Sequence, residues 1–125
     1  MFDISTNGIV RVNRGDSFEL PVNIVIGDIM NQTMYTLQDT DVLYIGVMEP
    51  NQPFETALIR KRITRKDLDS EGNIKVRFWP EDTVCVLPGK YYYQIKIETT
   101  VTLPNGEIRK DVETVVDKTL FYIQE

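Results

Sequence analysis

The 125-residue sequence contains no histidine and only one cysteine, Cys85. Without histidine, the chain lacks the commonest metal ligand and the commonest general base of enzymes. A single cysteine forms neither an internal disulfide nor a multi-cysteine zinc site. These absences exclude most familiar catalytic and metal centres, so the sequence predicts a protein that is not an enzyme and carries no metal or cofactor.

Long apolar runs are also missing. The first ten residues, MFDISTNGIV, lack the basic and apolar regions of a signal peptide, and no run approaches the roughly 18 apolar residues of a membrane span. The formal net charge of -5 opposes binding to a phosphate backbone, and the one basic run, 60–66, is short and interrupted by Ile63. We therefore expect no signal peptide, no membrane partner and no nucleic-acid partner.

What the sequence does contain is the composition of an ordinary folded domain. Hydrophobic residues make up 42% of the chain and charged residues 26%, which is too apolar for a disordered protein. A chain of this length buries one core. We expect residues 1–125 to form a single domain.

Period-two alternation predicts strands along most of the chain. Residues 18–26 place Phe18, Leu20, Val22, Ile24 and Ile26 on one face and Pro21 on the other, and the proline indicates a sheet edge or a bulge. Residues 41–49 are apolar on both faces, which is typical of a central strand. Gly46 within them indicates a bulge or a close approach by a neighbouring group.

Further strands are predicted over 8–12, 74–80, 91–103, 107–116 and 118–125, with Asn105-Gly106 as a hairpin turn. Residues 56–63 fit a strand or a short helix, and we favour the strand. Thr64 and Asp67 resemble a capping box that begins one helical turn, and 71–73 form a turn. About eight strands at this spacing predict an all-β sandwich of seven to nine mostly antiparallel strands.

Several acidic motifs have two interpretations. The Arg14-Gly15-Asp16 tripeptide matches integrin ligands, but a turn between strands is the simpler interpretation. Glu81 and Asp82 are compatible with acid-base or Ca²⁺ chemistry, yet adjacent carboxylates on an extended chain point to opposite faces. We favour a turn over 80–83 in which Asp82 or Thr83 binds backbone amides. We expect the scattered acids to be solvated loop residues: Asp28, Asp39 and Asp41.

Trp79 and Cys85 flank this turn. If Phe78 faces the core with Ile74 and Val76, alternation turns Trp79 away from it, toward an interface or a stacked ligand. Cys85 lies in the apolar stretch 84–87 without a group that would activate a thiol. We expect Cys85 to be buried and inert.

The stretch LPGKYYYQIKI, 87–97, separates its tyrosines by alternation. Tyr91, Tyr93, Ile95 and Ile97 share the core face, whereas the other face is surface: Tyr92, Gln94, Lys96 and Glu98. The spacing of Leu87, Gly89, Tyr91 and Tyr93 resembles the tyrosine corner of immunoglobulin-like domains, in which a tyrosine hydroxyl bonds back to the preceding connection. We assign Tyr91, Gly89 and Asp82 to this structural corner.

Four segments carry a resemblance to a known group: IVRVNRGDSFEL (9–20), 35–47 with Asp41-Val42-Leu43-Tyr44, WPEDT (79–83) with LPGKYYYQI (87–95), and a closing strand over 120–123. The chain resembles immunoglobulin-like structural proteins of tailed bacteriophages and prophages, and is similar to the N-terminal domain of phage baseplate upper proteins. This resemblance implies an immunoglobulin-like β-sandwich. In Tyr93 the chain departs from antibody domains, which carry their second cysteine there.

The resemblance implies a non-enzymatic structural or assembly module of the virion, in the tail or baseplate, made in the cytoplasm of the bacterial host. Its partners are expected to be phage structural proteins or copies of itself, in a homo-oligomer, with Trp79 and Tyr92 as contact residues. The alternative is a module that binds carbohydrate or a host surface, with Tyr92, Trp79 and Tyr44 as its platform.

Overall fold

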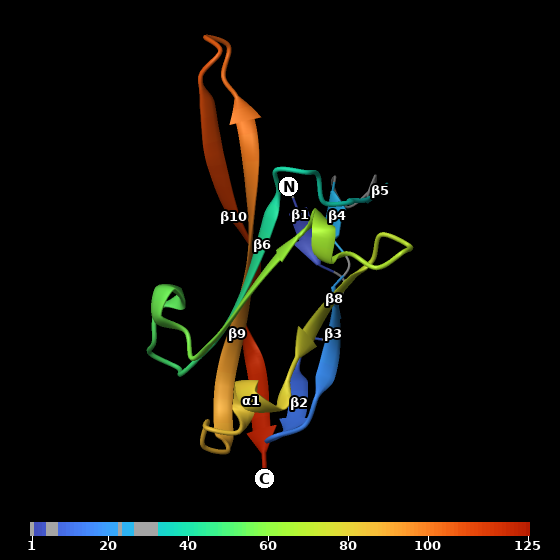
Figure 1. Cartoon of the computed structure of the whole chain (residues 1–125). Coiled ribbons are helices and arrows are strands. Elements are labelled where there is room, and N and C mark those ends of the chain that lie inside the picture. Colours follow the sequence, from blue (N-terminus) through green and yellow to red (C-terminus); the bar gives the residue numbers. More distant parts are fainter. Residues whose placement is uncertain (1, 5–7, 23, 27–32) are drawn as a thin grey trace.

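The computed structural model describes residues 2–4, 8–22, 24–26 and 33–125, and its elements are almost all strands (Figure 1). The strands are β1 (Phe2–Ile4), β2 (Val10–Asn13), β3 (Phe18–Val22), β4 (Ile24–Ile26), β5 (Thr33–Met34), β6 (Val42–Met48), β7 (Ile59–Thr64), β8 (Ile74–Phe78), β9 (Gly89–Thr102) and β10 (Ile108–Gln124). Only short helices interrupt them: η1 (Phe54–Thr56), η2 (Arg65–Asp67) and α1 (Pro80–Thr83). The all-β prediction is confirmed.

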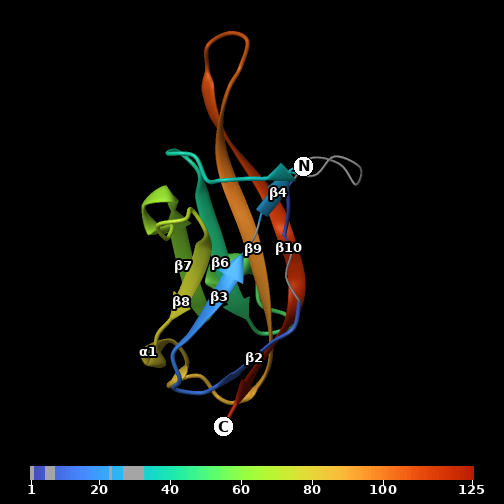
Figure 2. The same ribbon diagram turned by 90° about the vertical axis from the view of Figure 1, so that its right-hand side faces the viewer.

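A five-stranded sheet in the order β2-β10-β9-β6-β7 forms the larger layer. Its strands pair antiparallel except for β2, which runs parallel to β10. The smaller pairings are β3 with β8 and the order β1-β4-β5. Figure 2 shows β3 and β8 lying over the five-stranded sheet, so the inner faces of these strands enclose the core.

The core forms where the alternation predicts it. Ile74, Val76 and Phe78 are buried on β8, and the Phe78 ring stacks on Phe18 with centroids 4.4 Å apart. The Phe78 ring also lies 6.1 Å from that of Phe121. From β9 the structure buries the odd-numbered residues: Tyr91, Tyr93, Ile95 and Ile97. The predicted phase of both strands is therefore correct.

Strand β6 is central, as its apolar faces predict. It lies between β9 and β7, and every residue of it except Tyr44 is buried. A Cβ atom on Gly46 would lie 2.9 Å from Cε2 of Phe54 and 3.1 Å from Cβ of Ala57. Gly46 therefore allows the η1 segment to pack directly on the sheet, which confirms the close approach.

The β9–β10 hairpin extends beyond the rest of its sheet. Strand β6 pairs with β9 only over 92–98, so 99–102 and 108–111 pair only with each other among the described residues. The connecting loop has Gly106 at a φ of 88° and a 2.8 Å hydrogen bond from Leu103 N to Glu107 O. We call residues 99–111 the arm, and it projects at the top of Figure 1. The predicted Asn-Gly hairpin is confirmed.

Some strand boundaries differ from those predicted. The predicted strand 18–26 consists of β3 and β4, which belong to different sheets, and β1 and β5 were not predicted. The predicted strands 107–116 and 118–125 are one strand, β10, with register shifts between Thr114 and Thr119. Residues 56–58 are not strand, whereas the helical turn at Thr64 and its Asp67 cap are confirmed.

Asp41 was predicted to be solvated, and this is wrong. Its side chain is buried, and its carboxylate accepts hydrogen bonds from the Tyr35 hydroxyl and, at 2.9 Å, from the Gln38 amide. A buried carboxylate with two donors ties the start of β6 to the segment that precedes it. Asp39 is exposed as expected, and Asp28 lies outside the described residues.

We expect the Tyr35–Asp41 pair to make the fold sensitive to alkali. Burial, followed by the hydrogen bond and the charge of Asp41, raises the pKa of the Tyr35 phenol above its ordinary value of 10.0. Just above pH 10 the phenol proton of Tyr35 is released in the unfolded chain but is retained in the folded one. The contribution of the Tyr35–Asp41 pair to the free energy of unfolding is therefore complete below pH 10 and is lost as the pH rises through the folded-state pKa of Tyr35.

The measurement is urea unfolding across this alkaline range for the wild type and for Tyr35→Phe. The free energy of unfolding should fall with pH more steeply in the wild type, because the variant has no phenol at this position. Parallel curves for the two proteins would contradict the expectation.

Candidate functional site

Trp79 follows β8 and turns away from the core, as alternation predicts. Half of its surface is exposed, and the Arg77 guanidinium lies 4.8 Å from the centre of its ring. A cation over an aromatic face holds the ring in place while leaving the other face available. Trp79 is therefore an exposed aromatic group at one end of the molecule.

Asp82 fixes the loop that carries Trp79. Its carboxylate accepts a 2.7 Å hydrogen bond from Trp79 N and forms an ion pair with Lys61 of β7 at 2.6 Å. Thr83 is fully buried and accepts a 2.8 Å hydrogen bond from Gly15 N. Asp82 and Thr83 thus bind backbone amides, as expected for a structural role, although 80–83 form one helical turn rather than a simple turn.

The Arg14-Gly15-Asp16 tripeptide forms the predicted turn between β2 and β3. Gly15 has a φ of 84°, a value that favours glycine, and Asp16 N donates to Asn13 O at 3.1 Å. Arg14 forms a 2.6 Å ion pair with Glu125. These contacts support the interpretation of the tripeptide as a turn.

The prediction that Cys85 is buried is wrong, since its side chain is exposed. After α1 the chain crosses the end of the molecule and leaves Val84 52% and Leu87 75% exposed. The apolar composition of 84–87 suggested a core segment, but the Val86 N to Thr83 O bond continues the turn at the surface. These side chains and Trp79 form an apolar end loop, 79–87.

Tyr91 forms a hydrogen bond back to the preceding connection, as the assigned corner requires. The Tyr91 hydroxyl donates to Leu87 O at 2.5 Å, and burial, with the charge of Glu49, raises the pKa of this phenol. Gly89 lies close to the ring, because a Cβ at this position would be 3.7 Å from Tyr91 Cε2. The assignment of Asp82 to this corner is wrong, because its carboxylate binds Lys61 and the Trp79 amide and so stabilises the neighbouring end loop instead.

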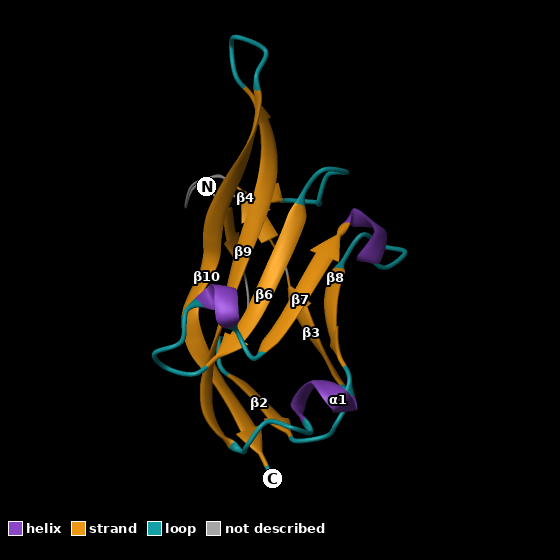
Figure 3. Cartoon of the chain, turned by 60° about the vertical axis from the view of Figure 1, so that its left-hand side comes forward, coloured by secondary structure: helices purple, strands orange, loops and turns teal. Residues whose placement is uncertain are grey.

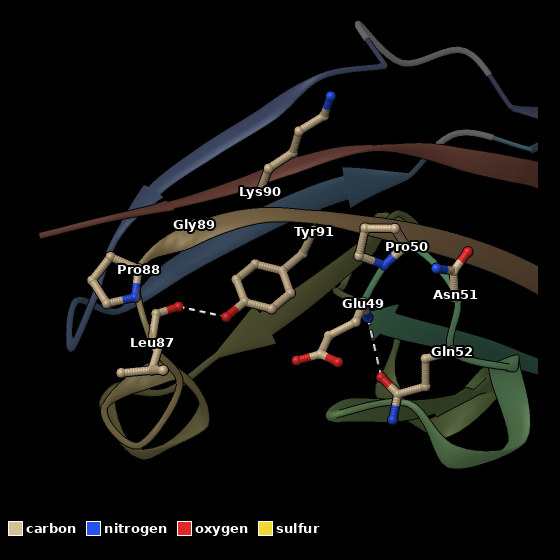
Figure 4. A pocket seen from close by; sticks show the side chains of 9 residues that line it. All are labelled: Glu49, Pro50, Asn51, Gln52, Leu87, Pro88, Gly89, Lys90 and Tyr91. Atoms are coloured by element: carbon tan, nitrogen blue, oxygen red, sulfur yellow. Dashed lines mark hydrogen bonds between the residues drawn. The ribbon is translucent and has the colours of Figure 1, made fainter.

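The corner also lines a groove of about 520 Å³ (Figure 4). One wall is the 49–52 loop and the other is 87–89, with the Tyr91 ring between them. Glu49 N donates to Gln52 Oε1 at 3.1 Å, which fixes the first loop. The carboxylate of Glu49 and the amide of Asn51 have no hydrogen-bond partner among the described residues, so both are available to a ligand.

We expect Tyr91→Phe to lower the free energy of unfolding by about 1 kcal/mol, because it removes one hydrogen bond at a buried position. Tyr92→Phe is the matched control, since the Tyr92 hydroxyl has no hydrogen bond within the described part of the chain. Chemical denaturation of the three proteins measures the difference. A larger loss in Tyr92→Phe would contradict the assigned strand phase.

Tyr92 lies on the opposite face of the five-stranded sheet, which we call the outer face. It is half-buried between Met48 and Leu120 of the neighbouring strands, with Lys90 Nζ 6.0 Å from its ring centre. Tyr44 shares this face, whereas Trp79 follows a strand of the other layer. The three aromatic residues proposed as one platform are therefore divided between two surfaces.

The outer face combines aromatic rings with cations. The Arg11 guanidinium lies 4.4 Å from the Tyr122 ring centre, and Lys96 Nζ lies 4.7 Å from that of Phe54. At the edge strand β7 the register places Arg60 beside Gly46 and Arg62 beside Tyr44. Figure 3 shows η1, which contains Phe54, in front of this face.

The sequence interpretation missed Phe54 and the cationic outer face. Alternation in 90–98 already placed Lys96 with Tyr92, but the pairing of β6 and β7 with β9 was needed to add the arginines. The Gly46 signal predicted a close neighbour, yet only the fold identifies it as Phe54. Long-range pairing, rather than local pattern, assembles this surface.

No family model, curated protein or solved structure was found to match the chain. Within the described ranges, no three His, Cys, Asp or Glu side chains gather to hold a metal ion. The described helices include none that is long and apolar enough to span a membrane.

Proposed function

We propose that this protein is a non-enzymatic structural or assembly module of a phage or prophage virion, in the tail or baseplate, and acts through protein-protein contacts. Its partners are virion proteins or copies of itself. The sequence resemblance is the reason for assigning the protein to a virion, and the exposed apolar surfaces support action through protein-protein contacts.

The projecting arm is the observation that carries the proposal. Ile108 is 67% exposed, and Val112, where the arm joins the sheet, is 59% exposed. A two-stranded ribbon is marginally stable in water by itself. Packing against another protein would bury both side chains and stabilise the ribbon, since each fully buried aliphatic side chain contributes about 1.5–3 kcal/mol.

An immunoglobulin-like topology is part of the proposal. The order β10-β9-β6-β7 corresponds to the G-F-C-C′ order of variable-type immunoglobulin sheets, and the β3–β8 pair corresponds to B–E of the facing sheet. The Tyr91 hydrogen bond to Leu87 O gives independent support, because it has the form of a tyrosine corner. Domains of this shape commonly expose their edges and end loops to partners.

The experiment is mass spectrometry of gradient-purified particles from a bacterium that carries the gene. The wild-type chain should be present in the particles. The double variant Ile108→Lys/Val112→Lys should fold normally but be absent from them. Arg109→Ala, on the opposite face of the arm, is the matched control and should be retained. Particles that lack the wild-type chain would contradict the proposal.

Carbohydrate binding is a second candidate function, and the groove of Figure 4 favours it. The Glu49 carboxylate and the Asn51 amide are the kinds of group that bind sugar hydroxyls, and neither side chain has a hydrogen-bond partner among the described residues. A glycan array tests it. A glycan signal that disappears in Glu49→Gln and Asn51→Ala but remains in Trp79→Ala would support carbohydrate binding at this groove. An array without any signal would contradict it.

A further inference from the structure

Strand β7 is an open edge of the five-stranded sheet. Among the described residues it pairs with β6 and with no other strand (Figure 3). The backbone N–H and C=O groups that point away from β6 are therefore available for pairing. An exposed edge of this kind is a template for an added strand from another chain. The side chains along it determine which strand is accepted.

The two faces of β7 differ in chemistry. Arg60 and Arg62 are exposed on the outer face, whereas Ile59 is buried and Ile63 half-buried on the inner face. Lys61, also on the inner face, is already paired with Asp82 at 2.6 Å. The charge available to a partner therefore lies on the outer face alone.

The two arginines border a hollow of about 390 Å³, with Tyr44 and Phe54 among its lining residues. Arg60 donates to the Glu55 carbonyl at 2.7 Å, which orients its guanidinium without neutralising it. The Arg62 side chain has no hydrogen bond or ion pair within the described chain. Oriented and unpaired guanidinium groups beside aromatic rings favour carboxylates, which they bind through two parallel hydrogen bonds.

We propose that β7 accepts an acidic β-strand from a partner protein, which extends the five-stranded sheet. Glutamate or aspartate at alternate positions of the added strand meets Arg60 and Arg62, and apolar residues between them pack beside Ile59 and Ile63. We infer an acidic partner strand from charge complementarity, because opposite charges across neighbouring strands stabilise pairing and like charges oppose it. The inference depends on the proposed assembly function and specifies its partner.

The test is an NMR titration of the ¹⁵N-labelled full chain with two capped peptides. One peptide alternates glutamate with valine, and its twin has lysine in place of glutamate. We expect the glutamate peptide to shift the amide signals of 59–64 and of η1, and the lysine peptide to leave them unchanged. Arg60→Glu/Arg62→Glu should reverse this preference, with about a tenfold loss of affinity for the glutamate peptide.

Arg11→Glu is the matched control, because Arg11 lies on the same face but on β2, at the opposite edge of the sheet. It should change the affinity less than about twofold if the peptide pairs with β7. An equal loss in Arg11→Glu would indicate general charge attraction and overturn the proposal.

Two other outcomes would also overturn it. Absence of glutamate-peptide binding would leave the arginines as groups that protect the edge from pairing. Binding of a short DNA duplex through the same arginines, without peptide binding, would assign the surface to another class of partner. Neither outcome affects the particle experiment, so failure of this inference is distinguishable from failure of the proposed function.

Discussion

Phe78→Ala is expected to lower the free energy of unfolding by about 3–5 kcal/mol, the usual cost of removing a fully buried aromatic ring. The Phe78 ring is inaccessible to solvent and contacts aromatic rings from two other strands, Phe18 at 4.4 Å and Phe121 at 6.1 Å between centroids. Its loss leaves a cavity between β3, β8 and β10, where the two layers meet. The remaining stability of a chain this size would be small.

Trp79→Ala is the matched control, since it removes a larger ring from the next residue. Because half of the Trp79 surface is exposed, its loss should cost less than about 1 kcal/mol. Urea unfolding followed by circular dichroism measures both variants, because Trp79 is the only tryptophan and its fluorescence is lost in the control. Equal losses, or a larger loss at Trp79, would mean that the phase of β8 is inverted.

The success of this phase prediction has a simple physical basis. In a strand half-buried between a core and solvent, side chains alternate strictly between the two environments, so Phe78 and Trp79 are distinguished by position alone. The same reasoning separated Tyr91 from Tyr92 correctly. Local alternation was sufficient wherever only one face of a strand meets the core.

The sequence interpretation failed where neighbours distant in the chain decide the outcome. Two separate strands, 107–116 and 118–125, were predicted here, but β10 runs through both with register shifts, and Asp117 accepts a 2.8 Å hydrogen bond from Gln94. The Asp117 pKa is lowered, chiefly by its hydrogen bond from the Lys118 amide. Pairing along β9 thus keeps β10 continuous through this irregularity.

Candidate contact residues were only partly accessible to sequence reasoning. Trp79 and Tyr92 were both selected because alternation turns them away from the core, which is a local property. Whether they share a surface depends on which sheets their strands join, and the pairing places them on different layers. The arginines of β7 gained their significance only from the edge position of that strand and from the hollow beside Phe54.

Gly46→Val is expected to lower the free energy of unfolding by about 1–3 kcal/mol, the range for overpacking a well-filled site. Strand propensity alone predicts the opposite sign, because glycine weakens a strand and valine favours one. Steric overlap outweighs this propensity and makes the substitution destabilising, since a Cβ at this position would lie 2.9 Å from Cε2 of Phe54 and 3.1 Å from Cβ of Ala57. Chemical denaturation of the two proteins measures the loss.

Phe54→Ala in the same chain gives the decisive comparison. If the Phe54 ring causes the loss, Gly46→Val should cost much less in the Phe54→Ala background, and the double-mutant cycle should give a coupling of about 1 kcal/mol or more. Additive effects would show that Phe54 does not cover Gly46. Because η1 also supplies the Glu55 carbonyl that orients Arg60, Gly46→Val should weaken binding of the glutamate peptide as well, which connects the packing of this face to its proposed partner.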